Sequence, residues 1–170
     1  MPASLEDLQK QVNILERLIR QLILARQKKS GKKSRQALLY EQARLHIGRD
    51  ASPMDIVSDD LGCAESVTNI IAKVIDFPII VGTATLYERL SKDTRFTRVN
   101  EHAGPGTIVV SPTGSGNGKI RGHTGILGPD KSIMSNDSVL AIWRQNYTID
   151  SWTARYKGIG NLPITYFRLD

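Results

Sequence analysis

The one cysteine of the chain, Cys63, immediately precedes a segment with helical periodicity. A thiol attacks as the thiolate, and the N-terminus of a helix lowers the pKa of a thiol by offering backbone N–H groups and a positive dipole end. The same amides can hold the oxyanion that forms when a thiolate attacks an acyl carbon. The plainer interpretation of Cys63 is a small buried core residue, which is the usual fate of a lone free cysteine.

A suitable base for such a thiol is His123, which lies between glycines at the start of a short apolar segment. The base of a thiol hydrolase must reach the sulfur and be oriented by a third polar group. Asn136, on the segment that returns towards His123, is the first candidate, and Ser135 and Asp137 are alternatives. Because side chains alternate along a strand, Asn136 faces away from the other two, and the sequence leaves open which face meets the imidazole. The plainer interpretation of His123 is a histidine in a surface turn.

Length and composition fit one medium domain with an appendage: 170 residues, 40% hydrophobic and 24% charged. A single cysteine excludes an intramolecular disulfide. We expect no metal and no cofactor, since no Cys/His spacing fits zinc and the glycine-rich segment 114–118 lacks the following Gly-Lys-Ser/Thr of a phosphate loop. There is no secretory signal and no apolar run long enough for a bilayer. The protein is therefore expected to be made in the cytoplasm without a signal peptide.

The basic excess of the chain lies at its N-terminus. Residues 1–49 contain 11 Lys and Arg against 4 Asp and Glu, whereas residues 50–170 contain 12 against 13. This asymmetry favours contact of a basic arm with an anionic cell envelope, although a solvated linker would have the same composition. Nucleic acid is the least favoured partner, because no aromatic residue that could stack on bases precedes Tyr40.

The sequence predicts three parts: an amphipathic helix over 1–26, a basic linker over 27–35 and a domain over 36–170. Apolar residues recur at heptad spacing between residues 5 and 22, which favours self-association, with packing on the chain's own domain as the alternative. In the domain we expect helices at 34–47, 65–75 and from Thr83 or Thr85 to 90, a short element at 54–57, and strands at 107–111, 124–127, 133–135 and 162–169. Helices followed by strands indicate an α+β fold. Four aromatic residues between 143 and 156 are interpreted as core in preference to a glycan-stacking surface.

From about residue 35 to the C-terminus, the chain resembles the papain-like cysteine hydrolases that cut bacterial cell-wall peptides, the superfamily of the CHAP amidases and endopeptidases, including phage lysins. The matching segments are LGCAESV at 61–67, GPGTIVV at 104–110, GHTGILG at 122–128 and IMSN at 133–136. Gly62 stands where many of these enzymes have an aspartate, and Gly106-Thr107 stands where Gly-Asp is usual.

This resemblance implies a papain-like fold, with N-terminal helices packed on a small antiparallel sheet, and an enzyme that cleaves an amide bond of peptidoglycan as an endopeptidase or N-acetylmuramoyl-L-alanine amidase. Cys63 would be the nucleophile, His123 the base, and Asn136 (or Asp137) the residue that orients the imidazole. The alternative is a non-catalytic phage structural or binding protein on the same scaffold, with the N-terminal helix as its assembly module.

Overall fold

The computed structural model describes residues 11, 18, 33–52 and 61–170, and the chain divides into two units, 1–33 and 34–170. Gln11 and Leu18 of the first unit lie in helical conformation and are exposed. Apart from these two residues, the predicted heptad helix lies outside the described residues, as do most of the linker over 27–35 and the short element at 54–57. In the part of the chain that the structure describes, no helix is long and apolar enough to cross a membrane.

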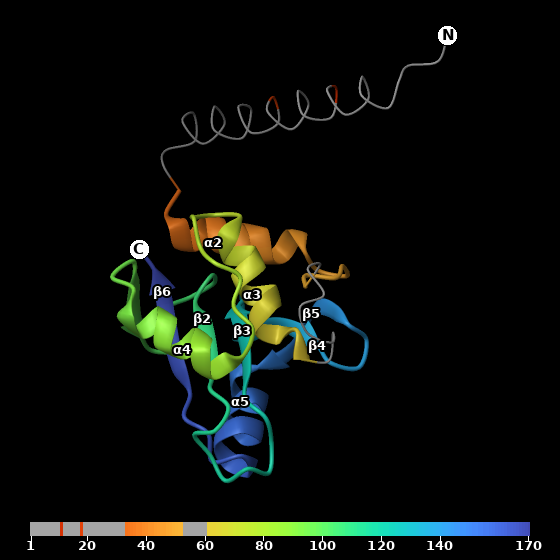
Figure 1. The fold of residues 1–170 in the computed structure, drawn as a ribbon, viewed down its shortest axis with the longest axis vertical. Helices are drawn as coiled ribbons and strands as arrows, with labels where there is room; N and C mark the ends of the chain where they lie inside the picture. The colour runs from red at the N-terminus through yellow and green to blue at the C-terminus, as the bar shows by residue number, and fades with distance from the viewer. Residues whose placement is uncertain (1–10, 12–17, 19–32, 53–60) are drawn as a thin grey trace. The chain divides into compact units, whose positions relative to one another are not determined.

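The second unit has an α+β fold in which three helices precede a six-stranded antiparallel sheet (Figure 1). The helices are α2 (Arg35–Leu45), α3 (Cys63–Ala72) and α4 (Thr83–Lys92). The strands are β1 (Phe96–Val99), β2 (Ile108–Ser111), β3 (His123–Leu127), β4 (Ser132–Asp137), β5 (Ile142–Thr148) and β6 (Thr165–Leu169), in the spatial order β1-β6-β2-β3-β4-β5. A short helix, α5 (Ile149–Trp152), continues into a π-helix, η2 (Thr153–Ile159), between β5 and β6.

Local hydrogen bonds define the start of α2 and hold the segment that follows its end. Ser34 caps α2, because its side chain accepts a hydrogen bond from the backbone N–H of Ala37 at 3.2 Å. The helix ends at Leu45, two residues before the predicted end. Gly48, three residues after the end of α2, has a left-handed backbone (φ +80°), and its N–H donates to the carbonyl of Trp143 on β5 at 2.8 Å. That bond ties the segment after α2 to the far edge of the sheet.

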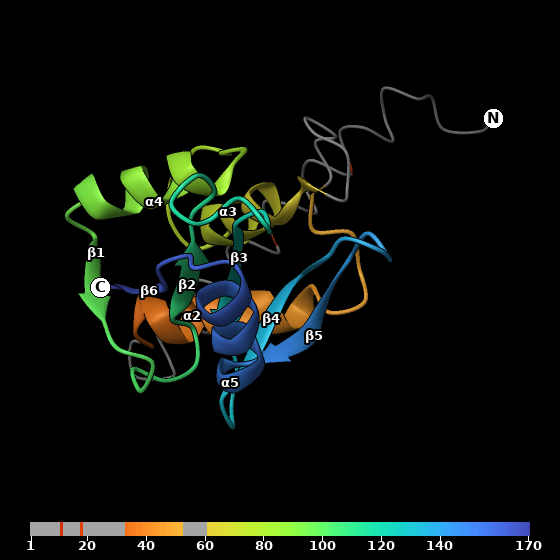
Figure 2. The same cartoon turned by 90° about the horizontal axis from the view of Figure 1, so that it is seen from below.

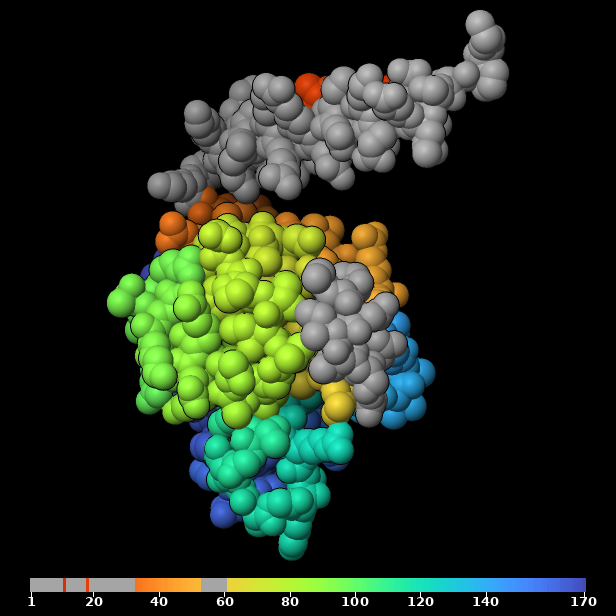
Figure 3. Space-filling model, in the orientation of Figure 1, coloured from red at the N-terminus to blue at the C-terminus, as the bar shows by residue number. Residues whose placement is uncertain are grey.

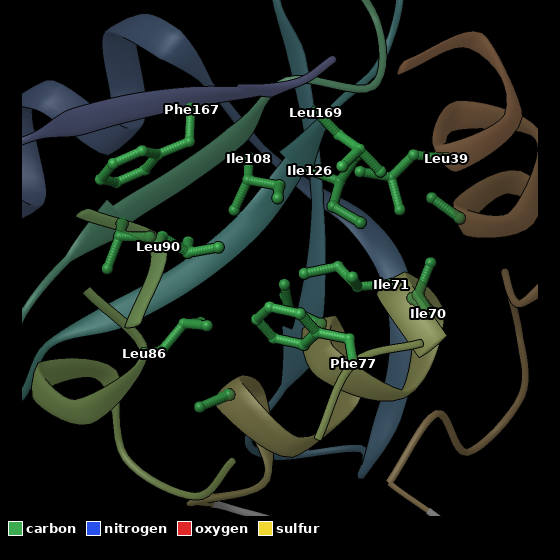
Figure 4. Close-up of a cluster of buried hydrophobic side chains, with 14 of the residues drawn as sticks. Leu39, Ile70, Ile71, Phe77, Leu86, Leu90, Ile108, Ile126, Phe167 and Leu169 are labelled. Atoms are coloured by element: carbon green, nitrogen blue, oxygen red, sulfur yellow. The ribbon is translucent and has the colours of Figure 1, made fainter. Parts of the chain in front are cut away.

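Each face of the sheet has its own apolar core. Helices α2, α3 and α4 cover one face, and α5 with η2 covers the other (Figure 2). On the first face, α3 buries Val67, Ile70 and Ile71 at helical spacing. The larger core, which includes Leu39, Phe77, Leu86, Leu90, Ile108, Ile126, Phe167 and Leu169, surrounds them (Figure 4). The second core is formed by Val109, Leu127, Ile133, Ile149, Trp152, Tyr156, Leu162 and Tyr166.

Two strands at the edges of the sheet, β1 and β5, were not expected from the sequence. Strand β1 is four residues long and has two exposed positions, so its apolar signal is weak. Strand β5 carries exposed polar residues, and a bulge opposite Ile133 and Met134 breaks its pairing with β4. A bulge shifts the alternation by one residue, so the period-2 pattern that marks a strand is lost. The four aromatic residues between 143 and 156 therefore lie on β5, α5 and η2.

Candidate active site

Cys63 is the first residue of α3 and follows the N-cap residue Gly62. The helix packs against β3 and β4, which leaves the thiol 8% exposed. Burial raises the pKa of this thiol from 9.0 to about 11, and hydrogen bonds from the backbone at Thr124, Ala64 and Cys63 itself offset only part of that rise. The expectation of a lowered pKa is therefore wrong, because the cost of desolvating a thiolate exceeds the stabilisation that the helix end provides. The contact with Thr124 places the sulfur beside the start of β3.

His123 begins β3, and aromatic rings surround its imidazole. The ring stacks on Trp152 (centroids 5.4 Å apart) and on Tyr156 (5.8 Å), and the edge of Tyr147 approaches at 6.0 Å. The pKa of His123 is lowered from 6.5 to about 4, mainly by burial and to a smaller extent by the charge of Arg155. The backbone of Asn136 and the charge of Asp137 act in the opposite direction and offset only part of that fall. At neutral pH the imidazole is therefore uncharged and able to accept a proton.

A relay of two hydrogen bonds sets the tautomer of this imidazole. Nε2 of His123 lies 3.0 Å from Oγ of Ser135, and that hydroxyl donates to Oδ1 of Asn146 at 2.7 Å. A serine hydroxyl has one hydrogen to donate. Because that hydrogen goes to Asn146, the oxygen of Ser135 must accept from Nε2–H, which leaves the lone pair on Nδ1. The relay therefore makes Nδ1 the basic nitrogen of the ring.

Asn146 is the member of this relay that the sequence did not reveal. In the pairing of β4 with β5, Ile133 faces Tyr147 and Met134 faces Gln145, so Asn146 is the extra residue of the bulge. A bulge redirects a side chain relative to the regular alternation, and here the Asn146 amide reaches Ser135. A pattern of alternating residues could not have identified a position whose function depends on a break in that alternation.

The three candidates for the third polar residue lie at different places around His123. Ser135 supplies the side-chain contact to the ring. Asn136 is buried, lines the same cavity as the imidazole and forms a hydrogen bond with it through its backbone. Asp137 also lines the cavity and forms an ion pair with Arg144 (3.6 Å). The side chain that meets the imidazole thus comes from the face of β4 that carries Ser135.

The residues before His123 are closely packed. A Cβ added to Gly122 would lie 2.3 Å from the carbonyl oxygen of Ser111 and 2.6 Å from Oγ1 of Thr83, so that only glycine fits here. The N–H of Gly122 donates to Oγ1 of Thr113 (3.0 Å), which is itself 3.0 Å from Oγ1 of Thr83. Thr83 is the first residue of α4, whose N-cap is Gly82, and its side chain joins the first turn of that helix to the segment that presents His123.

Cys63, His123 and Asn136 line one cavity of about 1070 Å³. Its walls come from the start of α3, the start of α4, the segment 119–123, the end of β4 and the helix η2. Figure 3 shows α4 from one side, in yellow-green, with the teal surface of the loop around 112–122 below it. The described residues contain no group of three or more His, Cys, Asp and Glu side chains that could hold a metal ion.

The high pKa of Cys63 has a measurable consequence. A rise from 9.0 to about 11 leaves about 100-fold less thiolate at neutral pH than an unperturbed cysteine would have. We expect alkylation by iodoacetamide at pH 7 to be at least roughly 10-fold slower in the folded protein than in urea, and its rate to rise with pH up to pH 10. Mass spectrometry of the intact protein follows the reaction. Fast alkylation at pH 6 that no longer rises with pH would contradict this account.

The relay through Ser135 predicts a loss of turnover more than a loss of binding. Ser135→Ala removes the side-chain partner of Nε2. For a reaction that uses this imidazole as its base, we expect kcat to fall about 10- to 100-fold, with KM changed less than about threefold. Because Asn146 acts through Ser135, Asn146→Ala should lose less, and the double variant should be no worse than Ser135→Ala. Steady-state kinetics of the three variants tests this. Losses that multiply in the double variant would mean that the two residues act independently.

No family model matches the chain, and no curated protein sequence matches it. Among solved structures, the chain is similar to a chain in the crystal structure of the type VI native effector–immunity complex Tae3–Tai3 from Ralstonia pickettii. The two chains are 12% identical, the match covers 81% of this chain and 100% of the other, and the TM-score is 0.52. At this identity the likeness concerns the fold alone: the second unit of this protein is an α+β domain with the fold of a chain from a type VI effector–immunity complex.

Proposed function

We propose that this protein is a cysteine hydrolase that cleaves an amide bond of bacterial peptidoglycan, in the manner of a phage lysin or another wall-directed enzyme. The observation that carries the proposal is the placement of one thiol and one imidazole of defined tautomer in one cavity. The thiol is that of Cys63, the first residue of α3, and it contacts the backbone of Thr124. The imidazole is that of His123, the residue directly before Thr124 in the sequence, and it lines the same cavity as Cys63.

In this mechanism the thiol and the imidazole are both neutral before the reaction, because the pKa of Cys63 is about 11 and that of His123 about 4. Nδ1 of His123 takes the thiol proton as the sulfur attacks the carbonyl carbon of the amide. The backbone N–H groups at the start of α3 stabilise the oxyanion of the tetrahedral intermediate. In this proposal Ser135 and Asn146 hold Nε2, so that Nδ1 is the nitrogen left to exchange protons with the reacting groups. The backbone of Asn136 forms a further hydrogen bond with the ring.

The intermediate collapses when the C–N bond breaks and the proton on Nδ1 passes to the leaving amine, which leaves a thioester on Cys63. His123 then removes a proton from a water molecule that attacks the thioester. The C–S bond breaks, the product leaves as a carboxylic acid, and the thiol recovers its proton. The net reaction consumes one amide and one water and releases one acid and one amine.

Two observations support a peptide of the cell wall as the substrate. The segments around Cys63 and His123 resemble those of wall-cutting cysteine hydrolases, and both residues lie in one cavity of the domain that those segments form. The domain also has a fold similar to that of a chain from a type VI effector–immunity complex. The proposal is tested by digestion of purified sacculi with the wild-type protein and with Cys63→Ala, where only the wild type should release soluble fragments.

The basic N-terminal region has a role of its own in this proposal. Its excess of Lys and Arg matches the anionic polymers of a bacterial envelope, and the apolar residues between 5 and 22 suit self-association. Deletion of residues 1–33 should weaken binding to intact cells at low salt and leave the hydrolysis of soluble muropeptides unchanged.

A second candidate is a non-catalytic binding or structural protein on the same scaffold. The observation that favours it is the burial of Cys63, whose raised pKa is that of an inert thiol. This candidate predicts that the wild type and Cys63→Ala bind walls equally and that neither cleaves them, so the sacculus digestion separates the two functions.

A further inference from the structure

Among the described residues, the wall of the catalytic cavity carries more positive than negative side chains. Three cationic side chains line it, those of Lys119, Arg121 and Arg155. Within the described part of the chain, no ion pair involves any of the three. The carboxylate of Asp137 also lines the cavity. It forms an ion pair with Arg144 at 3.6 Å and accepts hydrogen bonds from the backbone N–H groups of Val139 and Leu140.

Of these cations, Arg155 is held closest to the proposed chemistry. Its guanidinium lies over the ring of Tyr156, 5.8 Å from the centroid, and hydrogen-bonds with the hydroxyl of that tyrosine. Tyr156 in turn stacks on His123 at 5.8 Å. The guanidinium therefore lies within about 12 Å of the imidazole. That span corresponds to at most about three or four extended residues of a peptide.

We propose that Lys119, Arg121 and Arg155 form a carboxylate-binding subsite that selects acidic stem peptides and sets the distance from a substrate carboxylate to the bond that is cut. A guanidinium binds a carboxylate through two parallel hydrogen bonds, and such charge-assisted bonds are the stronger kind. The imidazole and the thiol are neutral at pH 7, so the described wall carries three positive charges against the one negative charge of Asp137, a balance that favours an anionic substrate. The inference deepens the proposed function and rests on it for the identity of the substrate.

The first measurement is one of binding and is independent of turnover. Muropeptides released from purified sacculi are compared with the same muropeptides after carbodiimide-coupled amidation with ammonia, which converts each carboxylate to a neutral amide of the same shape. With Cys63→Ala as the receptor, isothermal titration should give an affinity about 10- to 100-fold higher for the acidic form. The double variant Cys63→Ala/Arg155→Gln should lose this preference. Its affinity for both the acidic and the amidated muropeptides should equal the affinity of Cys63→Ala for the amidated ones.

Lys157→Gln is the matched control, because it removes one positive charge from the same helix, where Lys157 lines the cavity beside Tyr166 and not the catalytic one. This variant should keep the preference for the acidic form. Equal affinity of Cys63→Ala for the acidic and the amidated forms would overturn the subsite. The subsite would also be overturned if Lys157→Gln lost the preference as fully as Arg155→Gln.

Turnover by the protein with Cys63 intact separates this inference from the proposed function. Cleavage of both forms at equal rates would support the hydrolase and overturn the subsite. Tight binding of the acidic form by the Cys63→Ala protein, without cleavage of either form by the wild type, would support the subsite and overturn the hydrolase.

Discussion

Cys63→Ala should abolish the clearing of a suspension of purified cell walls, with a fall in rate of about 10⁴-fold or more. A nucleophile that forms a covalent intermediate has no substitute once its sulfur is removed, and losses of this size are typical for such residues. The substitution should leave the fold intact, because the thiol is a small group at the first position of α3. The measurement is the fall in turbidity over time, with circular dichroism as the check on folding.

Ser66→Ala is the control for this variant. Ser66 is also buried and lies one turn farther along α3. We expect Ser66→Ala to clear walls within about threefold of the wild-type rate, since nothing in the proposed mechanism uses this hydroxyl. Clearing by Cys63→Ala at a rate near that of Ser66→Ala would contradict a role for the thiol as nucleophile.

His123→Gln should reduce the same activity by about 10³-fold or more, because the glutamine amide cannot accept the thiol proton. The same variant should also change how stability depends on pH. The pKa of His123 is about 4 in the folded protein and near 6.5 when unfolded, so between these values the unfolded state binds more protons. The free energy of unfolding therefore falls as the pH falls from 6.5 towards 4.

The shift of about 2.5 pKa units bounds this loss at about 3 kcal/mol. The ring is partly exposed, so solvent screening should make the measured loss smaller. In His123→Gln this contribution to the pH dependence should be absent, whereas His102→Gln, in an exposed loop, should retain it. Urea denaturation of the three proteins between pH 7 and pH 4 tests this. An identical pH dependence in the wild type and His123→Gln would contradict the lowered pKa.

The sequence predicted the parts of the site that depend on local pattern. Cys63 does begin a helix, and the apolar spacing at Val67, Ile70 and Ile71 identified the face of that helix that is buried. His123 does begin a strand. These features could be predicted because helix periodicity and glycine-bounded strands are properties of neighbouring residues.

The properties of the site that depend on the packing of distant segments could not be predicted. The pKa of Cys63 is raised because α3 packs against β3, which desolvates the thiol more than the helix end stabilises its charge. Asn146 reaches Ser135 only because β5 bulges opposite β4. The interpretation of the aromatic series as core is correct for Trp143 and Trp152, which are fully buried, but Trp152 also stacks on the imidazole.

The choice among the three candidates for the third polar residue also required the structure. Strand alternation separates Asn136 from Ser135 and Asp137, but the sequence does not determine which face of β4 meets His123. The structure places the hydroxyl of Ser135 3.0 Å from Nε2 of the imidazole. The orienting role proposed for Ser135 follows from that contact and from the acceptor behind it, Asn146.

Mass spectrometry of the fragments released from a purified sacculus tests the central claim most directly. If Cys63 and His123 cleave an amide bond, the wild-type protein should release muropeptides with one new carboxyl end and one new amine end and with intact glycan linkages, and Cys63→Ala should release none. Fragments cut within the glycan, or amide cleavage that persists in Cys63→Ala, would contradict the account.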